Sequence, residues 1–508
     1  MAVAKAYAVA VVGVQGHVVE VEADLANGLP GLTVTGLPDA ALGEARDRVR
    51  AAVVNSGQAW PQRRITLGLS PAWLPKRGTG FDLALACAVL AAAGVVPADA
   101  LAGRMLIGEL GLDGSVRPVR GVLPAVLAAV RAGFGEVVVP HGNAAEAQLV
   151  PDLTVHTVRT LRSLVALLRG ELVEEEPVAR VATPVEPSRL DLADVAGQVT
   201  GRTAIEVAAA GGHHVLLVGP PGSGKTMLAE RLPGVLPALD LDSALEVTAI
   251  HSVAGTLPAG QPLVTRPPFV DPHHGASMSA VVGGGSGIAK PGAVSLAHRG
   301  VLFLDEAPEF GRSVLDALRQ PLESGSVSLT RVGGTAVYPA RFTLAMAANP
   351  CPCAKGRADC CCPPDSRRRY LAKLSGPLLD RVDMHVAVPR ITRAELLAED
   401  GVGEASERIA ARVLRARQTA SRRLAGTPWR TNGEVPGTEL LRRWALPRAA
   451  TRTAEMALDN GLLTARGYGR VMRLAWTLAD LRDVGIPGRD QVDLALTYRL
   501  GHSAEVAA

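Results

Sequence analysis

Short apolar runs, each followed by a turn or by acidic residues, mark predicted strands in the middle of the chain. The run VLLV at residues 215–218 leads into a glycine-rich turn, and VLFL at residues 301–304 leads into two adjacent acids. Runs that are short and apolar at every position are typical of parallel strands covered on both faces. The pattern therefore predicts a buried parallel sheet of the α/β class in this part of the chain.

The two ends of the chain follow different patterns. Residues 1–25 pass from small apolar residues into a strand-like alternation, and from about residue 394 onward Arg, Ala and Leu recur in a helical pattern. Between these parts, one acidic segment contains three prolines, which is typical of a linker. We predict a first domain (1–170), this linker (171–189), a core domain (190–393) and a C-terminal helical domain (394–508).

Composition sets few further limits. With 508 residues, 48% hydrophobic and 20% charged, the chain is long enough for about three domains that each bury a core. Its net charge of +4 neither implies nor excludes nucleic acid. The apolar run at residues 83–96 is too short to span a bilayer, ends at Pro97, and contains Cys87, for which we expect simple burial. We expect a cytoplasmic protein without a membrane span.

The strongest local motif follows the strand at residues 215–218 and matches G-x-x-x-x-G-K-[ST]. Glycines let successive backbone N–H groups surround a phosphate, the lysine reaches the β- and γ-phosphates, and the hydroxyl binds Mg²⁺. A chance glycine-rich turn would lack the preceding strand. The predicted nucleotide-binding residues are Gly219, Pro220, Pro221, Gly222, Ser223, Gly224, Lys225 and Thr226.

Two further strand ends carry polar side chains. Asp305 and Glu306 follow the strand at 301–304, and Asn349 ends the apolar run LAMAA. Adjacent acids at a strand end are often only solvated, but after a phosphate-binding loop they suit catalysis. Asp305 would complete the Mg²⁺ shell, and Glu306 would polarise the attacking water. ATP and Mg²⁺ are therefore the predicted substrate and cofactor.

The order of these motifs resembles an AAA+ ATPase, with Asn349 in the sensor-1 place. PHHGAS (272–277), the segment 283–310, NPCPC and SGPLLDRVD (375–383) resemble the YifB/ComM family of magnesium-chelatase-like ATPases, over nearly the whole chain. The resemblance implies an AAA+ P-loop α/β core, a magnesium-chelatase-type helical lid and a homo-hexameric ring. It also places the adjacent histidines of PHHGAS in an insertion that faces the pore.

Two arginines acquire expected roles from this resemblance. Arg381 of the LLDR motif would act as an arginine finger on the γ-phosphate of a neighbouring subunit. Its alternative is a surface arginine paired with Asp380 or Asp383. In the lid segment 463–481, Arg466 is the expected sensor 2, with Arg470 as the alternative and a solvated helix face as the simpler reading.

The first domain resembles the proteolytic domain of Lon, which has the α+β fold of ribosomal protein S5. The resemblance rests on segments 67–92 and 108–140. A Lon-type protease needs a serine nucleophile and a lysine base, and those places are taken by Gly80 and Leu123. Neither residue can perform this chemistry, so we expect no protease activity.

A cluster at residues 351–362 holds five of the six cysteines. Cys351 with Cys353, and Cys360 with Cys362, form two C-x-C pairs at positions where many family members carry such pairs. Four thiolates suit a closed, structural zinc site. Cys361 leaves open a shifted ligand set or a redox-sensitive loop.

The expected substrate of the motor is DNA. Residues 326–341 predict a basic hairpin that turns at 333–334 and carries Arg331 and Arg341. The resemblance implies a hexameric helicase for branch migration, acting on single-stranded or branched DNA. A chelatase-like motor that works through a partner subunit, and a nucleotide-dependent scaffold, remain alternatives. Further arginine groups suit DNA only in conjunction and individually fit solvated surfaces: 367–369 with Lys373, and Arg408, Arg412 and Arg415.

Overall fold

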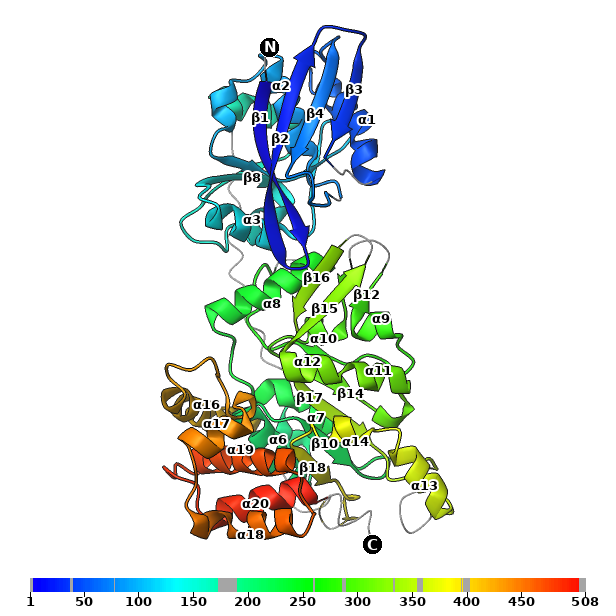
Figure 1. The fold of residues 1–508 in the computed structure, drawn as a ribbon, viewed down its shortest axis with the longest axis vertical. Helices are drawn as coiled ribbons and strands as arrows, with labels where there is room; N and C mark the ends of the chain where they lie inside the picture. Colours follow the sequence, from blue (N-terminus) through cyan, green and yellow to red (C-terminus); the bar gives the residue numbers. More distant parts are fainter. Residues whose placement is uncertain are drawn as a thin grey trace.

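The computed structural model describes residues 3–36, 40–76, 78–171, 190–258, 261–285, 289–331, 334–353, 360–393, 395 and 403–501. The predicted linker lies almost wholly outside these residues. Figure 1 shows an elongated molecule, with the amino-terminal sheet at one end and the carboxy-terminal helices beside a central sheet at the other.

The amino-terminal part is an α+β unit built on a seven-stranded sheet of order β3-β4-β2-β1-β5-β8-β9. In β1 and β2 buried and less buried residues alternate, because successive side chains point to opposite faces. The strands are β1 (Val3–Val12), β2 (Gln15–Ala26), β3 (Gly31–Thr35), β4 (Arg64–Ser70), β5 (Arg104–Leu106), β8 (Glu136–Pro140) and β9 (Thr154–Val158), and a small hairpin is β6 (Glu109–Leu110) with β7 (Val116–Arg117).

Helices cover this sheet, and the apolar run that contains Cys87 forms the most buried of them. Every residue of α2 (Asp82–Ala92) is buried, and Cys87 has no exposed surface, as expected. A helix that is apolar all round belongs inside a core. The other helices here are α1 (Ala40–Asn55), α3 (Val122–Arg131), α4 (Ala144–Ala147) and α5 (Leu161–Leu168).

The predicted parallel sheet is present in the central part. Its order is β11-β14-β17-β10-β18, and all neighbouring strands are parallel. The inner strands are buried at every position, which agrees with their uniformly apolar sequences. The strands are β10 (Val215–Val218), β11 (Phe269–Val270), β14 (Val301–Leu304), β17 (Thr343–Ala348) and β18 (Met384–Ala387).

Around this sheet lie short helices and two hairpins. The expected basic hairpin is formed by β15 and β16, although part of its predicted turn lies outside the described residues. The hairpins are β12 (Gly283–Gly284) with β13 (Lys290–Pro291), and β15 (Ser326–Arg331) with β16 (Gly334–Pro339). The helices are α6 (Val199–Gly211), α7 (Lys225–Val235), α8 (Leu241–Ala254), α9 (Met278–Val281), α10 (Ala293–Leu296), α11 (Arg312–Ala317), α12 (Arg319–Ser324), α13 (Pro364–Leu371) and α14 (Gly376–Leu379).

The C-terminal region is helical, as predicted, and shares one hydrophobic core with the parallel sheet. Leu217 of β10 and Met384 of β18 belong to the same buried cluster as Val471 and Val492. The helices are therefore packed firmly against the core. They are α16 (Ser406–Arg423), α17 (Gly437–Arg443), α18 (Arg448–Asp459), α19 (Ala465–Leu481) and α20 (Arg489–Leu500).

The amino-terminal unit touches the central part through the end of its longest hairpin. The turn between β1 and β2 meets β16 (Figure 1), where Gly13 adopts a φ of +65°. A Cβ at this position would lie 2.8 Å from the backbone oxygen of Val337, so only glycine permits the contact. Nearby, Glu146 accepts hydrogen bonds from the backbone N–H of Leu123 and from the Ser252 hydroxyl of α8. Within the described residues, no helix is long and apolar enough to cross a bilayer.

Candidate functional site

The glycine-rich loop connects the end of β10 to the first residue of α7, as the motif predicts. Gly222 and Gly224 have φ values of +72° and +89°, which side chains rarely adopt. At Gly219 a Cβ would lie 2.0 Å from the backbone oxygen of Val388, so this position is closed to any side chain. The loop can therefore direct its backbone N–H groups, and the N-terminus of α7, toward a phosphate.

The side chain of Lys225, the first residue of α7, turns back toward this loop. Its ammonium group donates hydrogen bonds to the backbone oxygens of Gly219 at 2.8 Å and Pro220 at 2.9 Å. A third bond, at 3.2 Å, reaches the side-chain oxygen of Asn349. Burial lowers the pKa of Lys225, and the nearby carboxylates of Asp305 and Glu306 oppose that shift. Lys225 is thus hydrogen-bonded to three other residues predicted for the ATP site and lies near two more.

Asp305 is held by contacts to both of its carboxylate oxygens. One accepts a hydrogen bond from the Thr226 hydroxyl at 2.9 Å, and the other accepts the backbone N–H of Glu306 at 2.8 Å. A hydroxyl and a carboxylate side by side are oxygen ligands of the type that Mg²⁺ prefers. The two residues predicted to hold Mg²⁺ are therefore adjacent, although Thr226 lies at the start of α7 and Asp305 directly follows β14.

Glu306 follows in an unusual backbone conformation, with a φ of +49°. Its carboxylate is half-exposed and lies 3.7 Å from Nδ1 of His274. The ring of His273 packs against that of His274, with centroids 4.1 Å apart. The sequence analysis missed this contact because it placed the histidines only in a pore-facing insertion. The signal was available, since PHHGAS directly follows β11, whose carboxyl end lies at the same edge of the sheet as Glu306.

Asn349 directly follows β17 and is followed by the cysteine cluster. The ligand atoms of Cys351, Cys353, Cys360 and Cys362 all lie within 4.8 Å of one another, while Cys361 is exposed. Three of the sulfur pairs lie 3.3, 3.4 and 3.6 Å apart, well beyond the length of a disulfide. The geometry selects the four cysteines that the sequence analysis paired, and their chemistry fits a closed tetrahedral metal site.

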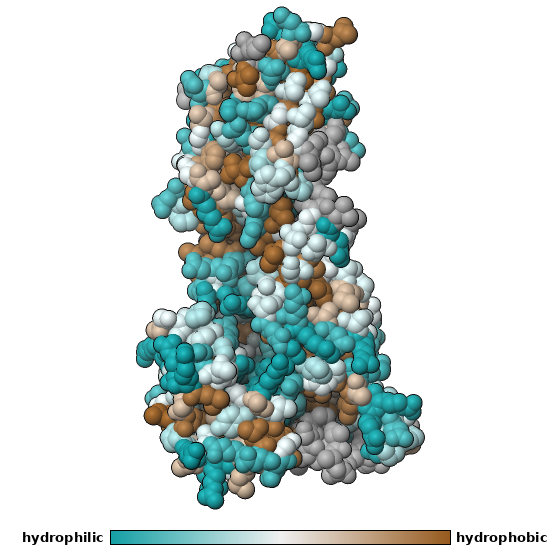
Figure 2. Space-filling view, in the orientation of Figure 1, coloured by the Kyte–Doolittle hydropathy of each residue, from teal (hydrophilic) through white to brown (hydrophobic). Residues whose placement is uncertain are grey.

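The predicted arginines lie at the opposite edge of the sheet. Arg381 precedes β18, and because the sheet is parallel, this edge is the one away from the glycine-rich loop. Arg381 forms an ion pair with Glu323 and donates to the backbone oxygen of Pro377 at 2.5 Å, instead of pairing with Asp380 or Asp383. It lines a cavity of about 1000 Å³, and hydrophilic side chains border the recess between the helices and the core (Figure 2).

Both sensor-2 alternatives line this cavity, but their contacts differ. Arg470 forms an ion pair with Asp383 at 2.5 Å. Asp383 is fully buried, and although burial alone would raise its pKa, Arg470 and His213 hold that pKa well below the usual range. Arg470 is thus tied to the fold. Arg466 also lines the cavity but is exposed, and it makes no hydrogen bond or ion pair in the described part of the chain.

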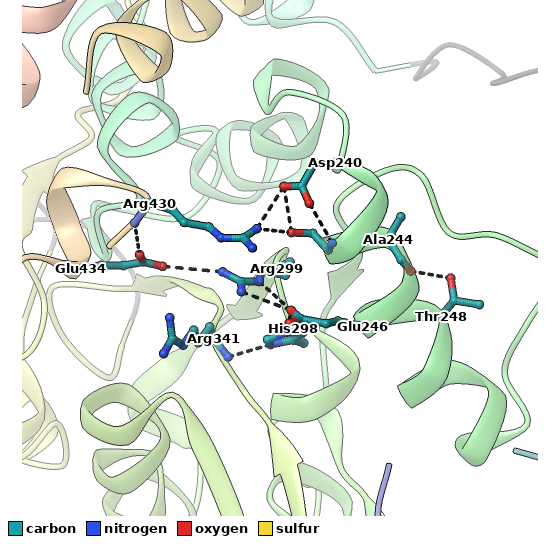
Figure 3. Close-up of polar contacts among 10 residues, drawn as sticks. Asp240, Ala244, Glu246, Thr248, His298, Arg299, Arg341, Arg430 and Glu434 are labelled. Carbon is teal, nitrogen blue, oxygen red and sulfur yellow. Dashed lines mark hydrogen bonds and ion pairs between the residues drawn. The ribbon is translucent and has the colours of Figure 1, made fainter. Parts of the chain in front are cut away.

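The two arginines of the basic hairpin lie in different places. Arg331 lies at the tip end of β15, where it pairs with Gly334. Arg341 follows the base of the hairpin and lines the cavity. Its backbone N–H donates to Nδ1 of His298 at 3.0 Å, while its guanidinium extends away from that ring (Figure 3). Arg341 thus lies away from the hairpin tip that carries Arg331, and the contact of either arginine with DNA stays a prediction.

A charged network forms the wall of the cavity beside Arg341 (Figure 3). Arg299 bonds to Glu246 of α8 at 3.2 Å and lies 3.8 Å from Glu434 of the helical region. Arg430 pairs with Asp240 at 3.0 Å. These contacts join α8 to the C-terminal helices across the cavity.

The other arginines considered for DNA binding also differ in their contacts. Arg412 forms ion pairs with Glu206 and Glu404 at 2.6 Å, which accounts for it within the fold. Arg367, Arg368 and Arg369 are exposed on α13 and remain available to a ligand.

Comparison with known proteins places the chain in a family. It is 40% identical over 491 residues to YifB of Escherichia coli, which covers 96% of each chain. It is also 41% identical over 510 residues to competence protein ComM of Haemophilus influenzae, with 98% of each chain covered. The chain belongs to the YifB/ComM family of magnesium-chelatase-like ATPases. An uncharacterized protein of Mycobacterium tuberculosis is 55% identical over 500 residues, covering 98% of this chain and 99% of the relative.

Three family models divide this YifB/ComM chain. Residues 191–396 match "Magnesium chelatase, subunit ChlI", residues 21–143 match "Subunit ChlI of Mg-chelatase", and residues 403–499 match "Magnesium chelatase, subunit ChlI C-terminal". Membership in this family indicates a nucleotide-dependent motor of the AAA+ type. A Lon protease of Salinispora arenicola is 31% identical over 170 residues, 31% of this chain and 22% of its own, which is weak support for a Lon-like first domain.

Proposed function

We propose that this YifB/ComM chain is a Mg²⁺-dependent ATPase that assembles into a homo-hexameric ring and remodels or translocates DNA, as a branch-migration helicase. The observation that carries the proposal is the joining of three strand ends at one edge of the sheet. Lys225 bonds to Asn349 and Thr226 bonds to Asp305, which places the motif residues of the loop against β17 and β14.

Each residue then has a defined task. The N–H groups of residues 219–224 and the Lys225 ammonium bind the phosphates of ATP, and Lys225 exchanges loop carbonyls for phosphate oxygens. Thr226 and Asp305 hold Mg²⁺, which neutralises charge on the phosphates when bound. Glu306 accepts a proton from the attacking water and orients it.

The separation of the two charged sites supports an assembly of several copies, which we propose is a ring. Within one chain, Arg381 and Arg466 lie at the edge of the sheet away from the glycine-rich loop. Each can serve only the γ-phosphate held by a neighbouring copy. The ion pair with Glu323 would hold Arg381 in place until the γ-phosphate of a neighbouring copy replaces the carboxylate.

The DNA assignment rests on exposed positive charge. Arg331 at the hairpin tip and the arginines of α13 are exposed and suited to phosphate contacts. These groups are sequence-independent binders, which a translocating motor requires.

The deciding experiment measures ATP turnover with and without single-stranded and branched DNA. We expect DNA to raise turnover, and the rise to weaken steeply with added salt through counterion release. ATP hydrolysis that ignores every form of DNA would contradict the DNA assignment.

A metal-insertion motor is the second candidate, favoured by the three magnesium chelatase matches. It predicts turnover that rises with a partner subunit and not with DNA. A nucleotide-dependent scaffold predicts little turnover, with or without DNA or a partner subunit.

The remaining proposals concern the cysteines and the first domain. Cys351, Cys353, Cys360 and Cys362 hold a structural Zn²⁺, since a closed four-thiolate site leaves no position for a substrate. Gly80 and Leu123 leave the first domain without protease chemistry, so it serves the motor in another way.

A further inference from the structure

The cysteine cluster is attached to the ATP site at both of its ends. Cys351 is buried and lies two residues after Asn349, whose side chain bonds to Lys225. On the other side, α13 begins at Pro364, two residues after Cys362. The cluster therefore lies between a residue of the ATP site and a helix.

That helix returns to Asn349. Tyr370, near the end of α13, is 5% exposed; burial raises the pKa of its hydroxyl to about 12, and the neighbouring backbone of Asn349 opposes that shift. The chain thus forms a closed path that leaves Asn349, passes through the four cysteines and α13, and comes back to Asn349. Anything that fixes the cysteines also fixes both ends of this path.

The spacing of the sulfur atoms fits one metal ion. Tetrahedral zinc with Zn–S bonds of about 2.3 Å places its sulfurs about 3.8 Å apart. The sulfur of Cys353 lies 3.3 Å from that of Cys351 and 3.6 Å from that of Cys360, and all four ligand atoms fall within 4.8 Å. Three of the four residues are only partly buried, so apolar packing does not explain why they converge.

We propose that Zn²⁺ bound by Cys351, Cys353, Cys360 and Cys362 holds Asn349 in the position that hydrolysis needs, so that metal occupancy controls turnover and not ATP binding. This inference rests on the proposed ATPase function. The separation of the two effects follows from the contacts of the site. Lys225 also bonds to two loop carbonyls, and Thr226 bonds to Asp305, neither through Asn349.

The test compares a double variant, Cys360→Ser with Cys362→Ser, with the matched control Cys361→Ser, whose thiol is exposed outside the four-ligand set. Zinc content, affinity for a fluorescent ATP analogue, turnover, and amide hydrogen exchange of residues 345–349 are measured under reducing conditions. We expect the double variant to lose about one zinc per chain, to bind the analogue within about twofold of wild type, and to lose at least tenfold in turnover. Exchange at 345–349 should rise, and the control should match wild type.

Loss of zinc with unchanged turnover and unchanged exchange would overturn the inference, as would a metal-free wild-type protein with full activity. Loss of analogue binding together with zinc would also overturn it. If the double variant does not fold, zinc is instead removed from the wild type with a chelator and then restored; exchange at 345–349 must rise when zinc is removed and fall when it is restored. Because exchange needs no ATP hydrolysis, an inactive wild type would refute the proposed ATPase while the tie between zinc and Asn349 is still tested.

Discussion

The ammonium group of Lys225 and the side-chain oxygen of Asn349 are hydrogen-bonded at 3.2 Å, although 124 residues separate them. The contact exists because β17 lies between β10 and β14, so Asn349 emerges beside the glycine-rich loop. Under the proposed function, Lys225 would bind the γ-phosphate, and Asn349 is placed to respond to it.

Binding and hydrolysis of ATP should separate at two positions. Lys225→Ala removes the phosphate-binding ammonium and should abolish nucleotide binding. Glu306→Gln keeps the shape of the site but removes its base, so it should bind ATP and lose about 100-fold or more in turnover. Equilibrium binding and single-turnover hydrolysis measure the two effects. Glu309→Gln, in the turn just after Glu306, is the matched control and should behave as wild type.

Arg381 should act on a neighbouring chain. Arg381→Ala should bind ATP nearly normally and lose about 1000-fold in turnover, the scale of a lost arginine finger. Doped into wild-type protein, it should lower activity by more than its own fraction. Glu323→Gln removes the ion-pair partner but keeps the arginine, and is the control. Full-rate hydrolysis by a monomer would exclude a role in trans.

The site was largely predictable from sequence where short motifs set the chemistry. The loop at 219–226 and the acids after β14 follow short apolar runs, which predict strands. In a parallel sheet the carboxyl ends of the strands lie at one edge, so these residues are brought together. The partners of these residues were less accessible. The order of the strands, and therefore the contact between Lys225 and Asn349, depends on packing across the whole domain.

The two hairpin arginines should have different effects. Arg331→Ala should reduce the stimulation of turnover by DNA and lower the slope of binding against salt by about one, as for one lost phosphate contact. Arg341→Ala should leave that slope unchanged, because Arg341 lines the cavity. Arg312→Ala, at an exposed position on α11, is the control. Equal salt slopes for the two variants would contradict this assignment.

Stability should fall in mild acid because of His214. Burial lowers its pKa to about 4, and its Nδ1 accepts the backbone N–H of Leu344, so the folded state keeps the ring neutral. Between about pH 6.5 and pH 4 the unfolded chain binds a proton that the folded chain refuses. The free energy of unfolding should therefore be about 2 kcal/mol lower at about pH 5 than at about pH 7.5 from this group alone.

Urea unfolding at the two pH values measures this difference. In His214→Gln the free energy of unfolding should depend less steeply on pH. The buried carboxylate of Asp383 does not contribute to this difference in the free energy of unfolding. Its pKa is depressed, so its contribution is complete at mild pH and is lost only as pH falls through that lower value. An unchanged slope in the variant would remove His214 as the cause.

Long-range pairing explains what sequence could not give. Arg470 is indistinguishable from Arg466 along α19, yet it pairs with Asp383, 87 residues away, while Arg466 faces the cavity. His274 lies beside Glu306 because β11 and β14 are neighbours. In each case the motif was visible, but its partner depended on the tertiary fold.

The placement of the glycine-rich loop and Arg381 at opposite edges of one parallel sheet has a consequence for symmetry. A contact that brings Arg381 of one copy to the loop of another joins two different surfaces, so it is heterologous and has a direction. Each added copy presents the same unused surface as the last. Such a contact never completes itself in a two-fold dimer, and repetition leads either to a closed circle or to an open helical filament. The rotation between neighbouring copies decides which of the two forms.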